Sequence, residues 1–113
     1  MIKKTWFILS LIFLLALALR VYSLGSVPWG FHNDEVDVGY VGKFLVLHGH
    51  DPAGNFLPLV FDKFGDFRPT GLFYLAGISQ LFLGSNEFAV RFVTALFGAA
   101  TVVVLYLFLN KLW

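Results

Sequence analysis

Two long apolar runs restrict what this chain can fold into. One extends over residues 6–24, where Arg20 is the only charge, and the other over residues 88–109, where Arg91 is the only charge. A helix of about 20 apolar residues crosses the roughly 30 Å hydrocarbon layer of a membrane. The chain is 58% apolar and only 13% charged, whereas about a quarter of the residues of a soluble domain are charged. The sequence therefore predicts an all-α membrane protein.

A third, shorter apolar run follows Pro69. Proline suits the first turn of a helix, where its missing N–H needs no partner, so we expect a helix to open there. Ser85 or Asn86 can cap the next helix, and Glu87 suits the positive end of its dipole. We predict about three membrane-spanning helices, at residues 5–24, 70–84 and 87–110, joined by a long loop at 25–69.

The distribution of charge predicts how these helices are oriented. Lys3 and Lys4 precede the first run, and the positive-inside rule then places the N-terminus in the cytoplasm. In this multi-pass arrangement loop 25–69, with six of the seven acidic residues, lies outside the cell membrane. A basic start before an apolar run is also found in signal peptides, and Ser23-Leu24-Gly25 offers small residues for cleavage. A cleaved signal peptide is the alternative interpretation of the first run.

The long loop has the composition of a folded segment. From Asp34 onward its apolar residues recur at helical spacing, namely Val36, Tyr40, Val41, Phe44, Leu45 and Leu47. Gly49 supplies a stop at the end of this pattern. We predict a short amphipathic helix on the membrane surface, weakened in its middle by Gly39 and Gly42.

Asp34 and Glu35 open this predicted helix and have two interpretations. With Asn33 as the cap, both acids can simply face the positive end of the helix dipole. Alternatively, a carboxylate held at the membrane surface can serve as a general base. Arg68 also has two interpretations, since it can anchor the chain at the interface or bind a phosphate at headgroup depth.

Other classes of site have little support in the sequence. His48 and His50 lie two residues apart in a glycine-rich turn, which is a weak metal signal. The chain has no cysteine, so a disulfide framework and a thiolate metal site are excluded. No run of Lys and Arg follows the pattern that binds a nucleic acid backbone.

Three segments in a fixed order carry a resemblance to a known family: GFHNDEVDVGYVGKFLVLHGHDP, GNFLPLVFDKFGDFRPTGLFYL and LFLGSNEFAVRFVTALFG. The chain resembles the N-terminal part of membrane glycosyltransferases of the GT-C fold, in particular the protein-mannosyltransferase-like family. It is also similar to the aminoarabinose transferase of lipid A modification. The resemblance extends from about Arg20 to Trp113.

The resemblance implies roles for individual residues. In the family, an acidic residue of the first outer loop is the catalytic base, which matches Asp34, with Glu35 beside it as support. A basic residue before the second helix holds the donor phosphate, which matches Arg68. Many relatives read Lys-x-Pro-x-Tyr there, whereas this chain has Arg68-Pro69 with Tyr74 further on. Tyr74 is the second candidate for substrate binding.

The expected reaction is transfer of a sugar from a polyprenyl phosphate to an acceptor hydroxyl of a protein, lipid or glycan, with inversion. The resemblance implies no certain cofactor, although some relatives with this fold use a divalent metal. Family members have roughly a dozen spans. We therefore expect an N-terminal fragment that is inactive without further helices or a partner subunit. The alternatives are a small non-enzymatic membrane protein that acts through helix packing and a piece of a transporter.

Overall fold

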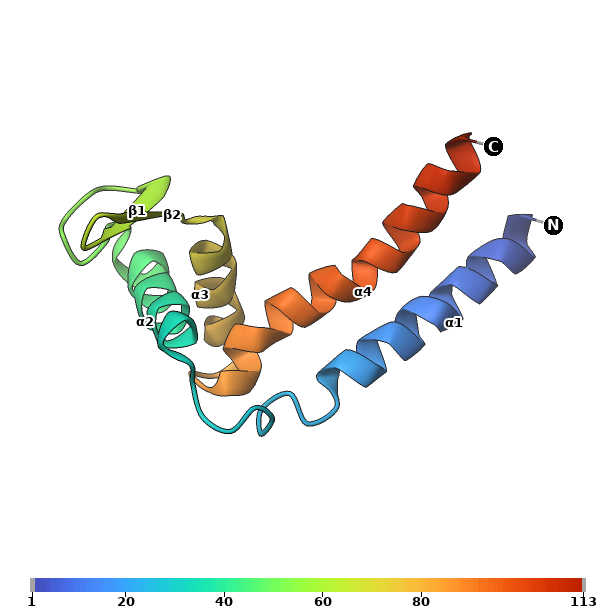
Figure 1. Ribbon diagram of the computed structural model, residues 1–113, viewed down its shortest axis with the longest axis horizontal. Helices are drawn as coiled ribbons and strands as arrows, with labels where there is room; N and C mark the ends of the chain where they lie inside the picture. The colour runs from blue at the N-terminus through green and yellow to red at the C-terminus, as the bar shows by residue number, and fades with distance from the viewer. Residues whose placement is uncertain (1, 113) are drawn as a thin grey trace. The chain divides into compact units, whose positions relative to one another are not determined.

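The computed structural model describes residues 2–112, which form four helices and one two-stranded hairpin (Figure 1). In chain order the elements are α1 (Ile2–Val21), α2 (Asn33–His48), β1 (Val60–Lys63), β2 (Asp66–Pro69), α3 (Gly71–Leu83) and α4 (Glu87–Leu112). They divide into two compact units, one made of residues 24–93 and one of the flanking segments 2–23 and 94–112. The fold is mostly helical, as predicted, but loop 25–69 contains the hairpin, which was not predicted.

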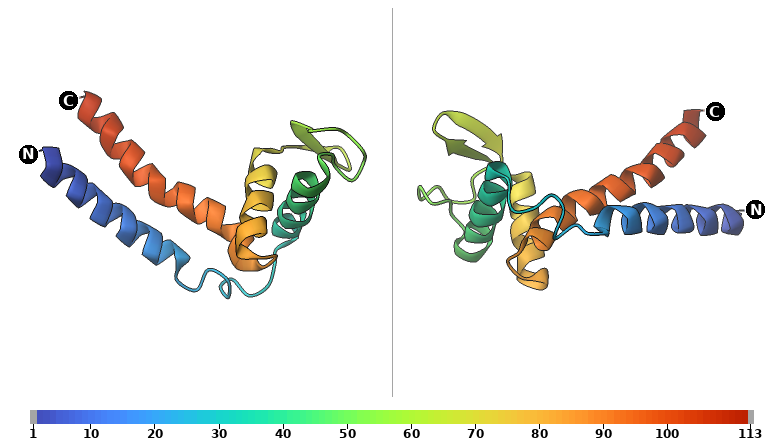
Figure 2. Two further views of the ribbon diagram at one scale, coloured as in Figure 1. Left: turned by 180° about the vertical axis from the view of Figure 1, so that it is seen from behind. Right: turned by 60° about the horizontal axis from the view of Figure 1, so that its bottom comes forward.

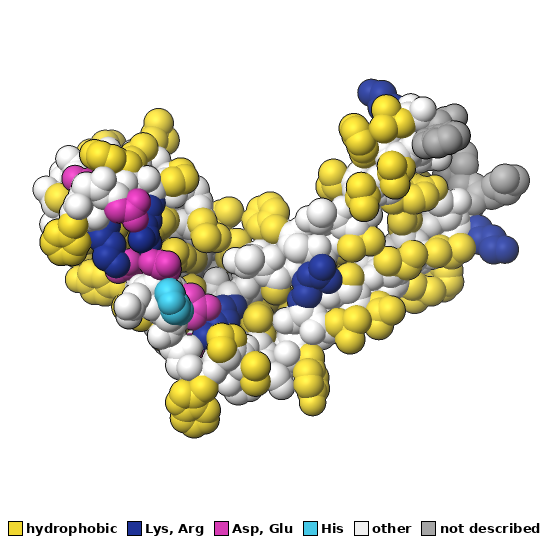
Figure 3. Space-filling view, viewed as in Figure 1, with side chains coloured by type: hydrophobic (Ala, Val, Ile, Leu, Met, Phe, Trp, Pro, Cys, Tyr) yellow, Lys and Arg dark blue, Asp and Glu magenta, His cyan; other side chains and the backbone are white. Residues whose placement is uncertain are grey.

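The unit of the flanking segments consists of α1 and the later part of α4, which run in opposite directions (Figures 1 and 2). Segments Lys3–Val21 and Glu87–Leu112 are long and apolar enough to cross a membrane. Their outer surfaces are apolar, as Figure 3 shows for one side. The first helix ends at Val21, three residues earlier than predicted, and Ser23 then takes a positive φ of 54°.

Helix α3 is shorter than the other predicted spans. Its 13 residues extend about 20 Å at 1.5 Å per residue, less than the roughly 30 Å of a hydrocarbon layer. Pro69 is the last residue of β2 and does not lie in the first turn of α3, contrary to prediction, because Thr70 occupies the N-cap position. Two helices of the described chain therefore meet the length and hydropathy expected of a span.

The core of residues 24–93 lies between α2 and α3, which pack in antiparallel directions. Val41 and Leu45 of α2 are buried against Phe73 of α3, and Val38, Phe61 and Tyr74 cover this cluster. The two backbones approach closely where Gly42 faces Gly77, since a Cβ on Gly77 would lie 2.2 Å from the Gly42 carbonyl oxygen. Gly42, which was predicted to weaken the helix, also allows this approach, since a Cβ on it would lie 2.2 Å from the Phe73 carbonyl oxygen.

The hairpin places charged residues beside α2. Its register pairs Phe61 with Arg68 and Lys63 with Asp66. The two connecting residues, Phe64 and Gly65, both have positive φ, 54° and 88°, as in the tight turns that match strand twist. Each strand also alternates in the direction of its side chains. The hairpin therefore presents Lys63 and Arg68 from neighbouring strands.

Helix α2 begins one residue earlier than its predicted cap implied. His32, not Asn33, is the N-cap: its Nδ1 accepts a hydrogen bond from the Asp34 amide, and Glu35 Oε2 accepts one from the His32 amide at 3.0 Å. This reciprocal pair is a capping box. Gly49 ends the helix with a φ of 72° and donates its amide to Leu45 O at 2.8 Å, as predicted.

Candidate active site

Acidic and basic side chains gather on one side of the molecule (Figure 3), and on α2 and the hairpin Arg68 lies within 4 Å of three carboxylates. Its Nη1 donates to Asp34 Oδ1 at 2.9 Å, and its Nε donates to Asp66 Oδ2 at 2.7 Å. The same Nη1 lies 3.7 Å from Asp37 Oδ2. Two of the residues predicted for the site, Asp34 and Arg68, are thus in direct contact although 34 positions separate them.

Asp37 and Lys63 complete this cluster, and sequence reasoning missed both. Lys63 Nζ donates to Asp37 Oδ2, so the hairpin supplies a second cation to the acidic side of α2. Asp37 follows Asp34 by three residues, a spacing that places two side chains on the same side of a helix. That spacing was the available signal for Asp37. Lys63 had none, because only the unpredicted hairpin brings it to α2.

The ion pairs decide the ionisation of the cluster. The hydrogen bond from Arg68 holds the pKa of Asp34 below its usual value, and the guanidinium charge acts in the same direction. Asp66 and then Asp34 raise the pKa of Arg68 in turn. The Asp34 side chain remains 59% exposed. It is therefore an ionised carboxylate that a substrate can reach, held in place by one guanidinium.

Glu35, the neighbour of Asp34, points to a different partner. Both of its carboxylate oxygens accept hydrogen bonds from Arg91 of α4, Oε1 from Nε at 2.8 Å and Oε2 from Nη2 at 2.9 Å. The hydrogen bond from Arg91 lowers the pKa of Glu35. Glu35 thus serves in the cap of α2 and in an ion pair, while Asp34 faces the hairpin.

Tyr74 lies on the first turns of α3 and is bonded to the loop before the hairpin. Its hydroxyl donates to Pro58 O at 3.0 Å, and the buried Thr70 hydroxyl donates to the same oxygen at 2.6 Å. The structure therefore places Tyr74 as an anchor of this loop. No hydrogen bond between Tyr74 and the Arg68 cluster is present among the described residues.

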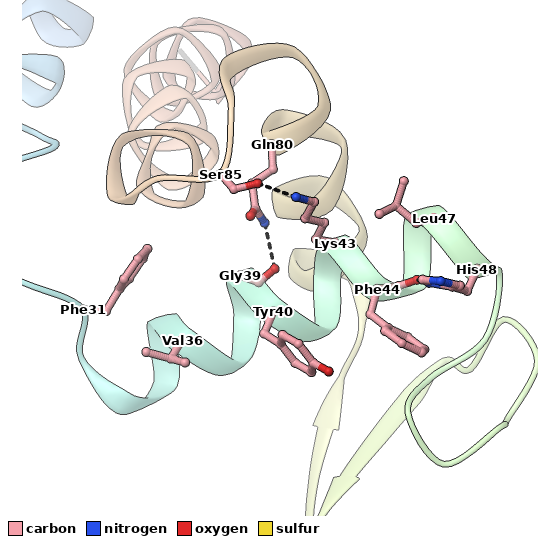
Figure 4. Close-up of a pocket in the computed structure, with 10 residues that line it drawn as sticks. All are labelled: Phe31, Val36, Gly39, Tyr40, Lys43, Phe44, Leu47, His48, Gln80 and Ser85. Carbon is pink, nitrogen blue, oxygen red and sulfur yellow. Dashed lines mark hydrogen bonds between the residues drawn. The ribbon is translucent and has the colours of Figure 1, made fainter.

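A groove of about 380 Å³ lies along another side of α2, lined chiefly by apolar side chains that include Phe31, Val36 and Tyr40 (Figure 4). Lys43 is one of the lining residues and donates to Ser85 Oγ at 2.7 Å. Lys43 follows Asp34 by nine residues, which is about 180° around a helix. The predicted apolar face of α2 is accordingly divided, since Val41 and Leu45 are buried in the core while Val36 and Tyr40 are exposed.

The two histidines at the end of α2 take part in local contacts. His48 stacks on Phe44 with ring centroids 4.3 Å apart, and His50 meets Phe44 edge-on at 5.4 Å. The ring Nδ1 of His50 lies 2.8 Å from the Asp51 carbonyl oxygen. Within residues 2–112, no three side chains of His, Cys, Asp or Glu are grouped as a metal site requires.

Comparison with known proteins supplies the family of this chain. The family of dolichyl-phosphate-mannose-protein mannosyltransferases matches residues 8–113. The undecaprenyl phosphate-alpha-4-amino-4-deoxy-L-arabinose arabinosyl transferase 2 of Pseudomonas fluorescens (strain Pf0-1) is 28% identical over 98% of this chain. The corresponding transferase of Pseudomonas savastanoi pv. phaseolicola (strain 1448A / Race 6) is 29% identical over 88% of it.

These relatives are much longer than the chain. The matched region covers 19% of the Pseudomonas fluorescens protein and 18% of the Pseudomonas savastanoi protein. No solved structure matches this chain. The family match nonetheless covers nearly all of the sequence, including both sides of the Asp34–Arg68 pair. This chain belongs to the dolichyl-phosphate-mannose-protein mannosyltransferase family.

Proposed function

We propose that this chain carries part of the active site of an inverting membrane glycosyltransferase that moves a sugar from a polyprenyl phosphate to an acceptor hydroxyl. Asp34 is the general base and Arg68 binds the donor phosphate. Glu35 supports Asp34 from the neighbouring position. Because the chain spans about a fifth of the length of its relatives, the complete gene product is the form expected to be active.

The observation that carries this proposal is the contact between Asp34 and Arg68. The hairpin brings the Arg68 guanidinium to 2.9 Å from the Asp34 carboxylate, so a base and a phosphate-binding cation lie side by side. A sugar phosphate bound by Arg68 would therefore have its anomeric carbon within a few ångströms of Asp34. A base must lie within hydrogen-bonding reach of the proton that it removes.

The chemistry requires only one carboxylate. Glycoside hydrolysis uses a second carboxyl group to protonate a poor leaving group, whereas a polyprenyl phosphate leaves as a stable anion. The acceptor oxygen forms a bond to the anomeric carbon while the bond from that carbon to the phosphate oxygen breaks. The acceptor proton passes to Asp34, and the electron pair leaves with the phosphate, whose charge Arg68 stabilises. Attack opposite the phosphate inverts the anomeric centre.

Lys63 and Tyr74 extend the proposed donor site. Lys63 lies on the strand paired with that of Arg68, two positions from its partner Phe61, and both cations approach Asp37 Oδ2, so Lys63 is proposed as a second cation near the phosphate. Tyr74 is proposed as a further donor contact through the hydroxyl that donates to Pro58 O. The site would lie at headgroup level outside the cell membrane, where a lipid-linked sugar phosphate resides, with the N-terminus in the cytoplasm.

The test is sugar transfer by the complete gene product in membranes. The donors are polyprenyl-phosphate-linked mannose and 4-amino-4-deoxy-L-arabinose, the sugars in the names of the family and its relatives. Asp34→Asn should lower kcat by about 100- to 10,000-fold, the range for loss of a general base. Asp66→Asn is the matched control, because Asp66 pairs with the same guanidinium but lies on the hairpin, and it should retain most of the rate.

Two results would count against the proposal. If Asp34→Asn transferred sugar at the normal rate, Asp34 would not be the base. If neither donor were used by the unchanged protein, while the protein still inserted into membranes and bound a partner, the non-enzymatic alternative would be favoured. Arg68→Gln adds a separate check, since it should raise the donor KM more than it lowers kcat.

A further inference from the structure

Arg91 is a buried arginine whose hydrogen-bonding capacity is fully used. Its side chain is 7% exposed, and a guanidinium has five N–H donors in a fixed planar arrangement. Nε and Nη2 donate to the two oxygens of Glu35. Nη1 donates to Leu24 O at 3.0 Å and Pro28 O at 3.1 Å, and Nη2 also donates to Gly30 O at 2.7 Å. Each of the five donors therefore has an acceptor.

These acceptors belong to the segment before α2 and to the first turn of α2. Three are backbone carbonyls of residues 24–30, and the other two are the carboxylate oxygens of Glu35. Residues 24–30 contain no helix or strand. Arg91 of α4 ties this irregular segment to the start of α2, because it donates to three of the segment's carbonyl oxygens and to both carboxylate oxygens of Glu35.

The position of Asp34 depends on the same contacts. Asp34 precedes Glu35 in the first turn of α2, and its amide donates to the capping ring of His32. The Glu35 carboxylate accepts the His32 amide in the same cap. A shift of Glu35 away from Arg91 would therefore move the cap and Asp34 with it, relative to Arg68 on the hairpin.

We propose that Arg91 is a positioning residue for sugar transfer, which holds the start of α2 through Glu35 so that the Asp34 carboxylate meets the donor beside Arg68. This inference rests on the proposed function, because it assigns Arg91 a role in placing the proposed base. Arg91 itself contacts neither the sugar donor nor the acceptor substrate. Lysine cannot replace it, since one ammonium with three donors cannot serve five acceptors in a plane.

The experiment measures steady-state transfer by the complete gene product carrying Arg91→Lys, Glu35→Gln or both. We expect each single change to lower kcat by about 100-fold, the cost of misplacing a catalytic group by about 1 Å, with the donor KM unchanged because Arg68 remains. The double variant should lose little more than either single variant, since both break one contact. Arg20→Lys is the matched control, because Arg20 donates to Ala16 O within its own helix, and it should keep the normal kcat.

The pH profile separates positioning from simple stabilisation. If Asp34 drifts from Arg68 in the Arg91→Lys variant, it loses the hydrogen bond that lowers its pKa, and the acid limb of kcat/KM moves to higher pH. The inference would be overturned if Arg91→Lys folded less well but each folded molecule kept the wild-type kcat and the wild-type acid limb of kcat/KM.

Comparing Asp34→Asn with Arg91→Lys distinguishes a wrong role for Arg91 from a wrong assignment of the base. If Asp34→Asn is inactive while Arg91→Lys retains the normal kcat and pH profile, only the positioning role of Arg91 is wrong. If Asp34→Asn is fully active, the assignment of the base fails first, whatever Arg91→Lys does. The amount of folded Arg91→Lys protein, measured by its elution from a sizing column in detergent, normalises the rate in every case.

Discussion

The close approach of α2 and α3 can be broken by one methyl group. In Gly77→Ala, the new Cβ would lie 2.2 Å from the Gly42 carbonyl oxygen, 2.6 Å from its carbonyl carbon and 2.7 Å from Val46 Cγ2. Two of these three atoms belong to the backbone and cannot rotate away. Since a Cβ atom essentially never lies within 3.0 Å of such neighbours, the helices must separate by about 1 Å.

The energetic cost follows from two opposing terms. Overpacking of a core costs about 1–3 kcal/mol, and separation of the helices also loosens the contacts of Val41 and Leu45 with Phe73. Replacement of glycine by alanine within a helix stabilises that helix by up to about 1 kcal/mol. We therefore expect Gly77→Ala to lower the free energy of unfolding by about 1–2 kcal/mol.

The assay is thermal unfolding of the purified complete protein in detergent. A loss of 1 kcal/mol lowers Tm by about 2–4 °C in a domain of 150–250 residues and by less in a longer protein, so Gly77→Ala should unfold at a Tm lower by up to a few degrees. Gly71→Ala is the matched control, because the added Cβ meets no described atom within 4 Å apart from its chain neighbours and the nearby backbone of its own helix, and its Tm should be unchanged or raised. Equal Tm values for the two variants would refute the close packing of α2 on α3.

Three further substitutions, at Arg68, Tyr74 and Glu35, address the site, with Thr70→Val as the comparison for Tyr74. Arg68→Gln removes the main cause of the lowered pKa of Asp34, so the acid limb of kcat/KM should move to higher pH as the donor KM rises. Tyr74→Phe should raise the donor KM and cost about 1 kcal/mol of stability, whereas Thr70→Val, which removes the other hydrogen bond to the same Pro58 oxygen, should cost stability alone. The pKa of Glu35 is lowered on folding, so its stabilisation is present above its unfolded value and is lost as pH falls through the folded value. Tm measured from neutral to acid pH should fall less steeply for Glu35→Gln, and a parallel fall would contradict the Arg91 ion pair.

Sequence reasoning was most successful where the signal is local. The apolar run at residues 88–109 predicted α4, and the cap at Asn86 is confirmed, since its Oδ1 accepts the Ala89 amide at 2.9 Å. The stop at Gly49 followed from the ability of glycine to adopt a positive φ. In each case the residue and its partner lie within one helical turn, so no knowledge of the rest of the fold is needed.

The hairpin was missed because its turn lacks the usual residues. Asn-Gly or Asp-Gly is preferred where both turn residues have positive φ, and here Phe64 precedes Gly65. The Asp62 side chain closes this turn by accepting the Gly65 amide at 2.7 Å. With four residues in each strand, the alternation was too short to predict the pair.

The sequence by itself determined the apolar helices, the stop at Gly49 and the acidic pair in the first turn of α2, because these depend on neighbouring residues. The tertiary structure decided which charges meet. Asp34 pairs with Arg68 across 34 positions, and Glu35 pairs with Arg91 across 56. The local sequence pattern alone does not decide which of the two adjacent carboxylates, Asp34 or Glu35, pairs with which arginine. Successive side chains on a helix point about 100° apart, so Asp34 faces the hairpin and Glu35 faces α4 only once both are packed against α2.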